Sequence, residues 1–435
     1  MKYLPINSAL FTQNREKFTG KMQKDSLCIL NANDEFPRSG DQNFAFRQNS
    51  DLFYLCGIDQ EQTILLLYPD APNPRHRQLL FLRETNEHIA VWEGHKYTRS
   101  EAAQVSGIPV EQIYWLKDFD NLLPTCMHYA QQVYLNTNEN DRYGNQTDYR
   151  DLRFIRSLRE KYPLHSFLRA APLLSNLRMY KSVTETGLTA EAVAITGKAF
   201  DRVLKFITPG VSEYELEAEI IHEFIRNRAS GHAYSPIIAS GSQACILHYN
   251  DNNRICQEGD LVLMDFGAEY GNYNADMSRT IPVSGRFTPR QRQVYEAVLR
   301  IFKQARNLLK PGKLLEDYRQ ETDRIAELEI LGLGLISEAE LTENNGNISV
   351  FKKFYPHGIS HFLGLDVHDV GNRYTLLEPG MLLTCEPGIY IPAESLGIRL
   401  ENNILITESG NIDLLAHIPI EIDEIEAIMN GQLVS

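Results

Sequence analysis

The stretch LVLMDFGAEYGNYNADMSRTIPV, residues 261–283, decides the fold of the C-terminal half of the chain. Its first four residues are apolar and predict a buried strand, and residues 273–283 predict a second strand. The turn-forming sequence Tyr-Gly-Asn at 270–272 joins them, so a hairpin centred on Tyr-Gly is predicted. In that register Asp265 and Asp276 face each other, with Cβ atoms about 4.5–5.5 Å apart. Carboxylates this close repel unless one is protonated or a cation lies between them; in a different register, one of them would face solvent.

Three later motifs contain further side chains of the kinds that bind metals. His361 lies in PHGISHFLGLDVHD, Glu386 in LLTCEPGIY and Glu401 in GIRLENNILIT. Together with the two aspartates they make four carboxylates and one imidazole, each within an apolar or turn-like run. Buried carboxylates are costly unless they are paired or bound to a metal. An oxygen-rich set with one nitrogen suits hard or borderline divalent ions, so the sequence indicates a metal site.

In this order the five residues resemble the dinuclear metal set of the pita-bread metallopeptidases, and within that group the aminopeptidase P family. The matching segments are 240–252, 264–280, 357–371, 378–392 and 397–407, and FRQNSDLFYLCGI at 46–58 is similar to the family's N-terminal domain. The resemblance therefore spans the whole chain. It implies an α/β architecture with two domains. Residues 1–175 would form a creatinase-like N-terminal α/β domain, and residues 176–435 a C-terminal pita-bread α+β metallopeptidase domain.

The resemblance also implies a chemistry. The chain would be a hydrolase, a metalloaminopeptidase that releases the N-terminal residue from peptides with proline in the second position. Two divalent ions would be bound, Mn²⁺ being the best fit and Zn²⁺, Co²⁺ or Fe²⁺ the alternatives. Asp265 would bind one ion, Asp276 and Glu401 would bridge both, and His361 and Glu386 would complete the second. Glu386 would in addition accept a proton from the attacking water.

Five more residues of the C-terminal half match positions around the metals in this family. His248 and His368 would hydrogen-bond the scissile carbonyl or the developing oxyanion, and His357 would line the proline side of the pocket. Arg399 and Tyr390 would brace the metal ligands. A single histidine is more often structural, but three of them fall inside matching motifs.

The N-terminal half would help to form the substrate cleft and the oligomer, a homodimer or homotetramer. Asp41, in RSGDQNFAFRQ, matches an aspartate in the network around the arginine and tyrosine of the metal site. Trp92, in VWEGHKY, matches an aromatic residue that closes the cleft, often that of a neighbouring subunit. The alternative reading is a turn residue for the aspartate and ordinary packing for the tryptophan.

Composition excludes several classes of protein. The chain has 435 residues, 43% hydrophobic and 23% charged, which is ordinary for a globular protein. Its net charge of −14 disfavours nucleic acid and anionic membrane surfaces as partners. The six cysteines are scattered and predict reduced thiols. The N-terminal segment lacks the features of a signal or transit peptide, and no apolar run approaches the ~20 residues of a membrane span, so a cytoplasmic location is expected.

Other members of the fold group are alternatives. Prolidase, which cleaves Xaa-Pro dipeptides, shares all five ligands, but GISH at 358–361 and the short connection from Glu386 to Arg399 favour aminopeptidase P. A non-catalytic pita-bread peptide-binding protein or a creatinase-like hydrolase would typically lack the ligands. A methionine aminopeptidase would not resemble the N-terminal domain. One departure from the family pattern is Asn402-Asn403, where an acidic residue commonly follows the glutamate.

Secondary structure follows from hydrophobic periodicity and from helix-capping signals. Strands are predicted at 27–30, 62–68, 78–82, 132–135, 235–240 and 246–249. Helices are predicted at 8–22, 98–105, 154–162, 176–210, 212–230, 288–310 and 314–331. The polar segment 138–149 is predicted to be a loop, and the polar segment 336–347 is predicted to be a loop or a short helix. Two helices before the hairpin and two after it suggest an internal pseudo-duplication.

Overall fold

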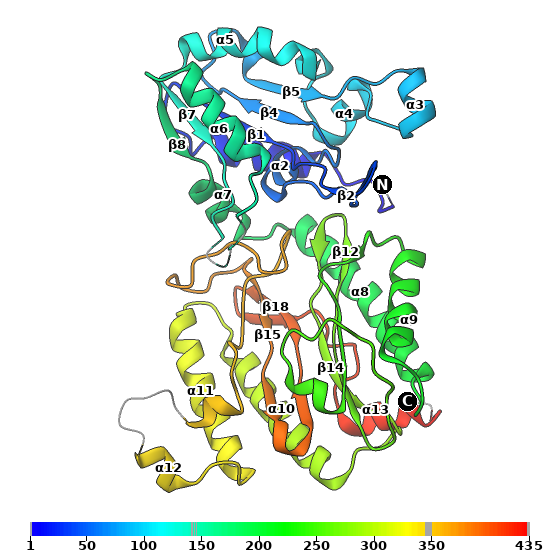
Figure 1. Ribbon diagram of the computed structural model, residues 1–435. Helices are drawn as coiled ribbons and strands as arrows, with labels where there is room; N and C mark the ends of the chain where they lie inside the picture. The colour runs from blue at the N-terminus through cyan, green and yellow to red at the C-terminus, as the bar shows by residue number, and fades with distance from the viewer. Residues whose placement is uncertain (1, 141, 143, 145, 344–349, 433–435) are drawn as a thin grey trace. The chain divides into compact units, whose positions relative to one another are not determined.

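The computed structural model describes residues 2–432 except 141, 143, 145 and 344–349 (Figure 1). The chain forms two compact units, unit 1 (Tyr3–Arg178) and unit 2 (Met179–Ser435). Within the described part of the chain, no helix is long and apolar enough to cross a membrane. All six cysteines are free thiols, and only one of them is not fully buried.

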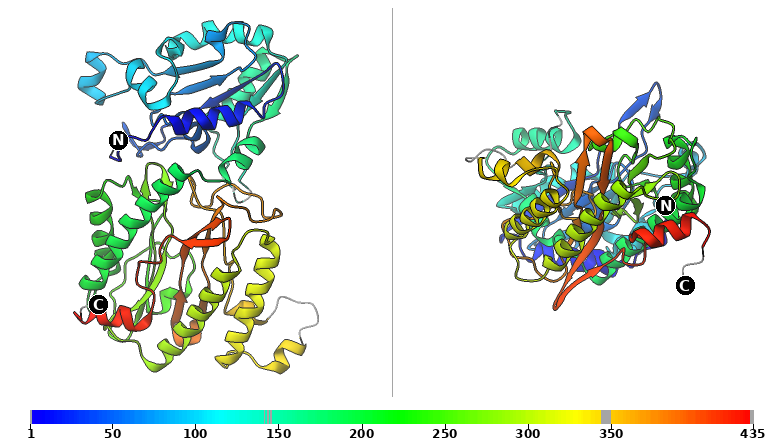
Figure 2. Two further views of the ribbon diagram at one scale, coloured as in Figure 1. Left: turned by 180° about the vertical axis from the view of Figure 1, so that it is seen from behind. Right: turned by 90° about the horizontal axis from the view of Figure 1, so that it is seen from below.

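Unit 1 is a six-stranded sheet in the order β6-β5-β4-β1-β7-β8. The central strand β1 pairs antiparallel with β4 and parallel with β7. Its residues are buried throughout because helices cover both faces, with α1 and α5 on opposite sides in Figures 1 and 2. The strands are β1 Ser26–Asn31, β4 Ile64–Leu67, β5 Gln78–Leu82, β6 Ile113–Trp115, β7 Gln132–Leu135 and β8 Ser166–Arg169.

The helices of unit 1 flank this sheet. They are α1 Ala9–Thr19, α2 Ser50–Cys56, α3 Glu87–Glu93, α4 Arg99–Ser106, α5 Phe119–Tyr129, α6 Arg150–Lys161 and α7 Ala171–Arg178. Phe119 and Leu123 of α5 and Leu158 of α6 pack in one cluster with Leu27 and Ile29 of β1. The predicted strands at 78–82 and 132–135 are confirmed with these bounds. Helix α2 and strands β6 and β8 were not predicted, because they are short and two of them are only half-buried.

Unit 2 contains several small antiparallel sheets and the helices that flank them. The sheets are β10-β11-β14, β13-β12-β9, β15-β18-β19 and β16-β17. Their strands are β9 Gly231–His232, β10 Ile237–Ser240, β11 Leu261–Asp265, β12 Ala268–Tyr270, β13 Tyr273–Asn274, β14 Ser278–Pro282, β15 Leu382–Cys385, β16 Gly388–Ile391, β17 Leu396–Arg399, β18 Asn402–Thr407 and β19 Gly410–Asp413. Figure 1 shows α8 and α9 (green) on one side of these strands and α11 (yellow) on the other.

Two helices precede the hairpin and two follow it, as predicted. They are α8 Val183–Phe206, α9 Glu213–Arg226, α10 Pro289–Leu308 and α11 Leu315–Gly332, followed by α12 Glu338–Glu343 and α13 Ile422–Met429. Ser212 forms the predicted capping box at the start of α9, and Thr288 caps α10. Residues 344–347 of the predicted polar segment lie outside the described residues.

Two predicted elements are wrong. The helix predicted over 176–210 is two helices, because α7 ends at Arg178 and a capping box at Ser182 starts α8 anew. The strand predicted at 246–249 is a turn that follows the 3₁₀ segment Gly241–Cys245. Gly241 has a φ of +55°, which turns the chain away from the direction of β10.

The register predicted for the hairpin is also wrong, by two residues. Tyr270 pairs with Tyr273, so the turn is Gly271-Asn272, and Asp265 pairs with Ser278. Both turn residues have positive φ, the geometry that a tight hairpin turn needs. Asp276 lies in the gap between β13 and β14, where the ladder is interrupted.

Candidate metal centre and active site

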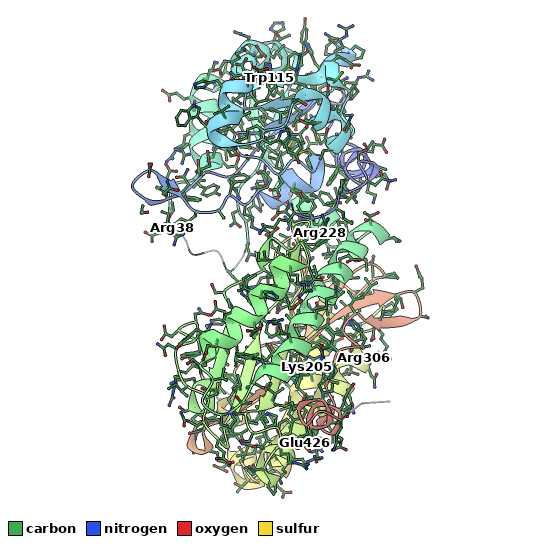
Figure 3. All side chains as sticks on the ribbon, turned by 90° about the vertical axis from the view of Figure 1, so that its right-hand side faces the viewer. Arg38, Trp115, Lys205, Arg228, Arg306 and Glu426 are labelled. Atoms are coloured by element: carbon green, nitrogen blue, oxygen red, sulfur yellow. The ribbon has the colours of Figure 1, made fainter. Side chains whose placement is uncertain are left out.

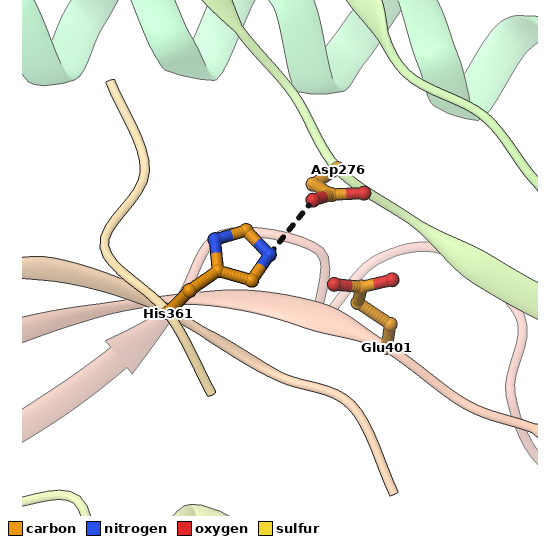
Figure 4. A group of neighbouring side chains, drawn as sticks. All are labelled: Asp276, His361 and Glu401. Carbon is orange, nitrogen blue, oxygen red and sulfur yellow. Dashed lines mark ion pairs between the residues drawn. The ribbon is translucent and has the colours of Figure 1, made fainter. Parts of the chain in front are cut away.

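Three of the predicted ligands meet in a small space. The ligand atoms of Asp276, His361 and Glu401 all lie within 4.8 Å of one another, and Figure 4 shows the three side chains pointing toward a common point. His361 Nε2 is 3.3 Å from Asp276 Oδ2. The three residues come from three different connections: the one before β14, the one before β15 and the one between β17 and β18.

The other two predicted ligands border this group. Glu386 Oε1 is 3.6 Å from His361 Nε2. Tyr234 links Asp265 and Asp276. Its hydroxyl oxygen is 2.5 Å from Asp265 Oδ1 and 2.6 Å from Asp276 Oδ1. The structure therefore brings all five predicted ligands together although the hairpin register differs from the prediction. Tyr234 was not predicted, since nothing in its sequence context marks a hydroxyl that bridges two carboxylates.

The ring of His361 is oriented as a metal ligand needs. Its Nδ1 is 2.9 Å from the carbonyl oxygen of Phe362, which makes Nδ1 the protonated donor and turns Nε2 toward the carboxylates. Thr384 fixes the backbone beside it, donating its N–H to the His361 carbonyl and accepting the His361 N–H at its hydroxyl. The Thr384 hydroxyl also reaches Glu386 Oε1 at 3.3 Å. One β15 residue thus orients two ligands.

Electrostatics show that the cluster has too few positive charges of its own. Burial, with the charges of Asp276 and other carboxylates, raises the pKa of Glu401 well above its usual range. Burial and Asp276 raise the pKa of Glu386 to about 7, although His361 opposes the shift. Burial alone would lower the pKa of His361, but the hydrogen bond and charges of Asp276 and Glu386 raise it to about 9. The charged forms of Glu386 and Glu401 are thus disfavoured in the absence of a cation, and a group of four carboxylates with one imidazole fits a site for divalent cations.

Arg399 is the nearest fixed cation. It is 4% exposed, and its Nη2 donates to Asp265 Oδ2 at 2.6 Å, Nε to Ser278 Oγ at 2.9 Å and Nη1 to the Tyr390 hydroxyl at 2.9 Å. Burial would lower its pKa, but Tyr390 and Asp265 raise it above the usual value. Ser278 in turn donates to Glu401 Oε2 at 2.8 Å. A single guanidinium therefore braces ligands on both sides of the cluster.

A hydrogen-bonded chain leads from Arg399 to His357. The Tyr390 hydroxyl, which accepts from Arg399, is 2.7 Å from His357 Nε2, and His357 Nδ1 is 2.7 Å from the Gly358 carbonyl oxygen. Burial and then the charge of Arg399 lower the pKa of His357 to about 4, with a smaller contribution from His248. The imidazole is therefore neutral, with its proton on Nδ1 and the Tyr390 hydroxyl donating to Nε2.

The two remaining histidines are exposed. The His368 ring lies 4.5 Å from the His361 ring, centroid to centroid and perpendicular to it. His248 lies on the turn after the Gly241–Cys245 segment. Side chains that approach from outside the buried cluster are suited to contacting a bound substrate.

Two predicted residues belong to unit 1. Asp41 is exposed beside the short hairpin of β2 (Pro37–Ser39) and β3 (Gln42–Asn43), and its Oδ1 accepts from Gln42 Nε2 at 3.1 Å. Trp92 is on α3 and 77% exposed. Their proposed roles toward the metal site and toward another subunit stay predictions.

Further residues that the prediction did not name support the ligands. The side-chain amide of Asn403 accepts from the Asp276 N–H and donates to the Asp276 carbonyl oxygen. The buried Arg279 donates to the Glu401 carbonyl oxygen at 2.8 Å. Asn402, which departs from the family pattern, donates to both oxygens of Asp413 instead of joining the cluster.

Comparison with known proteins agrees with this geometry. Residues 188–408 match the family model of metallopeptidase family M24, and residues 11–134 match the aminopeptidase P N-terminal domain. The chain is 34% identical to an Xaa-Pro aminopeptidase of Haemophilus influenzae, over 97% of either chain, and 34% identical to that of Escherichia coli, over 98% of either chain.

Solved structures give the same assignment. A putative aminopeptidase P from Bacillus anthracis superimposes with a TM-score of 0.91 at 34% identity, covering 99% of this chain and 100% of that one. Aminopeptidase P from E. coli with the inhibitor Pro-Leu superimposes with a TM-score of 0.87 at 32% identity, covering 98% and 99%. This chain therefore belongs to metallopeptidase family M24, as a pita-bread metallopeptidase domain preceded by an aminopeptidase P N-terminal domain.

Proposed function

We propose that this protein is an Xaa-Pro aminopeptidase, which hydrolyses the bond between the first residue of a peptide and a proline in the second position. The observation that carries the proposal is the convergence of Asp276, Glu401 and the Nε2 of His361, with Glu386 beside His361 and Asp265 linked to Asp276 through the Tyr234 hydroxyl. Relatives at 34% identity over nearly the whole chain have this activity in their names, which supports the substrate class.

The residues present would hold two divalent ions. Asp265, Asp276, His361, Glu386 and Glu401 are the proposed ligands, and Mn²⁺ is the proposed metal because carboxylate-rich sites suit it. An E. coli relative has been solved in a Zn-substituted form, so this ligand type also accepts zinc. Such ions, when bound, polarise the scissile carbonyl and lower the pKa of water.

The chain's own groups would then handle the protons and the oxyanion. Glu386 is the proposed acceptor of the proton of the attacking water, since its Oε1 lies at the edge of the cluster, 3.6 Å from His361 Nε2. His248 and His368 are the proposed donors to the scissile oxygen, from the exposed side of the cluster. His357 and Tyr390, held by Arg399, would line the proline side.

Selectivity for proline has a physical rationale. The Xaa-Pro bond is a tertiary amide whose nitrogen cannot donate a hydrogen bond. A site that required an N–H at this point would reject it, whereas imidazoles around a compact apolar pocket accept it. The free α-amino group of the first residue would face the acidic cluster, which accounts for cleavage of a single terminal residue.

The experiment measures product release from a Xaa-Pro-Yaa tripeptide and a Xaa-Pro dipeptide, with Mn²⁺ and with chelator. Mn²⁺-dependent release of Xaa from the tripeptide, with the dipeptide slow, is the expected result. A preference for the dipeptide would instead identify a prolidase with the same chemistry. Cleavage of neither, by a protein that holds two metals, would leave a peptide-binding role and end the proposal.

The remaining proposals concern assembly and location. A homodimer or homotetramer is proposed, in which Trp92 on α3 contacts a neighbouring subunit. A cytoplasmic location is proposed from the free thiols of the six cysteines.

A further inference from the structure

The loop that carries His248 is held at both ends by one buried side chain. The loop begins after Ser240 and ends before Arg254, and Glu213, the first residue of α9, is 0% exposed beneath it. Glu213 Oε1 accepts from the Ser240 N–H at 2.7 Å and from the Ser240 hydroxyl at 2.6 Å. Its Oε2 accepts from the Tyr249 hydroxyl at 2.8 Å and from the Arg254 N–H at 2.9 Å. Four donors therefore converge on a single carboxylate.

The loop needs such anchors because it has little regular structure. After the 3₁₀ segment Gly241–Cys245 it runs as turns without strand pairing. A second anchor is Asn252, at a φ of +43°, whose Oδ1 accepts from Ile238 N and whose Nδ2 donates to Glu217 Oε2. The first half of the loop packs tightly, since a Cβ on Gly397 would lie only 2.2 Å from the carbonyl oxygen of Ala244.

We propose that Glu213 is a positioning residue for His248. Tyr249 directly follows His248, so a hydrogen bond from its side chain to Glu213 restrains the residue whose Cα is about 3.8 Å from the Cα of His248. Glu213 acts through the loop and not on the substrate. A displacement of about 1 Å in a catalytic group costs up to a hundredfold in rate, so the anchoring has kinetic consequences. This inference rests on the proposed function for its kinetic part only.

Replacing Glu213 by Gln isolates the effect with almost no change in size. The glutamine amide keeps one oxygen, which can accept from one pair of donors. Its NH₂ group must then face the other pair, either the two donors of Ser240 or those of Tyr249 and Arg254. The hydroxyls of Ser240 and Tyr249 can rotate to accept from it, whereas the backbone N–H of Ser240 or Arg254 cannot. One buried N–H is therefore left without an acceptor, and the loop must shift to satisfy it.

The kinetic test is a double-mutant cycle of Glu213→Gln with His248→Ala on an Xaa-Pro-Yaa tripeptide. We expect Glu213→Gln to lower kcat/KM by about tenfold to a hundredfold in the wild-type background. In the His248→Ala background it should have almost no further effect, because its action passes through His248. Full additivity of the two losses, or wild-type kinetics for Glu213→Gln, would overturn the proposal.

Two more variants control this cycle. Glu219→Gln makes the same chemical change on α9, where the carboxylate pairs with Arg202 away from the loop, and it should leave kcat/KM unchanged. Tyr249→Phe removes one of the four donors and should give a smaller loss in the same direction, which keeps the test usable if Glu213→Gln does not fold.

Hydrogen exchange gives a readout that does not need activity. In Glu213→Gln, or in Tyr249→Phe if that variant is used, amide exchange should accelerate in peptides covering residues 240–254 and stay as in wild type in β11 and β14. Unchanged exchange in the loop would overturn the anchoring role whatever the kinetics. A wild-type protein that does not cleave the tripeptide would contradict the proposed function instead, so the two failures are distinguishable.

Discussion

Two carboxylates of unit 1 are balanced within the protein, whereas the four carboxylates of the candidate metal centre in unit 2 share too few internal partners. In unit 1, Asp51 Oδ1 is 2.7 Å from Arg178 Nη1, and Asn136 donates to its other oxygen. Asp151, 5% exposed, accepts from Asn31 at 2.8 Å, and burial, followed by the charge of Asp51, raises its pKa to about 7. One carboxylate is thus paired with a cation, and the other can stay protonated near neutral pH.

The cluster in unit 2 is different. Four carboxylates share one fixed cation, Arg399, which contacts Asp265 within the set. Burial raises the pKa of both Glu386 and Glu401, and neither has an arginine or lysine partner among the described ion pairs. A buried carboxylate with an internal partner is therefore part of the scaffold, whereas a group of carboxylates that share too few partners marks a site for an external cation.

The largest expected effect comes from removing a ligand in unit 2. Asp276→Ala should lose metal and lower activity by at least about a thousandfold, because several kcal/mol of transition-state stabilisation disappear. The fold should remain, since the substitution relieves repulsion around Glu401 and Glu386. Metal content, kcat and circular dichroism measure the three expectations. An active variant that keeps its full metal content would contradict the assignment of Asp276 as a metal ligand, and with it the difference between the two units.

Removing a carboxylate in unit 1 should instead change stability. Burial raises the pKa of Asp151 to about 7 in the folded protein. The contribution of the protonated side chain to stability is therefore full below about pH 3.8 and is lost as the pH rises to about 7. Asp151→Asn should abolish this loss and make the variant more stable than wild type at pH 8, by at most about 4 kcal/mol.

Urea unfolding of wild type and Asp151→Asn between pH 5 and pH 8.5 measures this difference. Peptidase activity at neutral pH should be unchanged in the variant. Asp201→Asn, at an exposed carboxylate of α8, is the control and should show no such pH dependence. Equal stability of wild type and Asp151→Asn at every pH would show that Asp151 is compensated in some other way.

Arg399→Lys should have an intermediate effect. The guanidinium contacts Asp265, Ser278 and Tyr390 at once, and an ammonium cannot reproduce that planar fork. We expect kcat to fall by about tenfold to a hundredfold through misplaced ligands, with the protein still folded. Wild-type kcat in Arg399→Lys would show that the bracing is not needed.

The smallest effect is expected at an exposed ion pair. Lys205 Nζ is 2.6 Å from Asp201 Oδ2, with side chains 62% and 54% exposed, and Lys205 lies on the surface of α8 (Figure 3). Lys205→Ala should change the free energy of unfolding by less than about 0.5 kcal/mol, because water screens the pair. A larger change would mean that exposure is a poor guide to which charged groups matter here.

The sequence predicts the long, periodic and capped elements well. The capping boxes at Ser212 and Thr288 mark helices that the structure contains, and the apolar run at 261–264 is a buried strand. The hairpin register could not be derived, because Gly271-Asn272 and Tyr270-Gly271 are both plausible turns by composition. In the observed register Gly267 lies against Ala275, where a Cβ would be 1.8 Å from the Ala275 carbonyl oxygen, and this close approach is not visible in the sequence.

The candidate site is predicted in part. Its metal-binding side chains are of unusual type for their apolar surroundings, which is why the sequence reveals them. Other residues contribute only because the fold brings them close to the site or to its loop. Tyr234 contacts two aspartates and Glu213 lies beneath a loop, but both have ordinary sequence contexts. Glu213 in particular is indistinguishable in sequence from any acidic residue in the first turn of a helix.

The central claim is that the unit 2 cluster is built around external cations. Calorimetric titration of Mn²⁺ into metal-free protein tests it most directly, with Asp276→Ala as the comparison. The account predicts two ions bound per chain and a rise in melting temperature, with both effects strongly reduced in the variant. Binding that is absent in the wild-type protein, or equal in the two proteins, would contradict it.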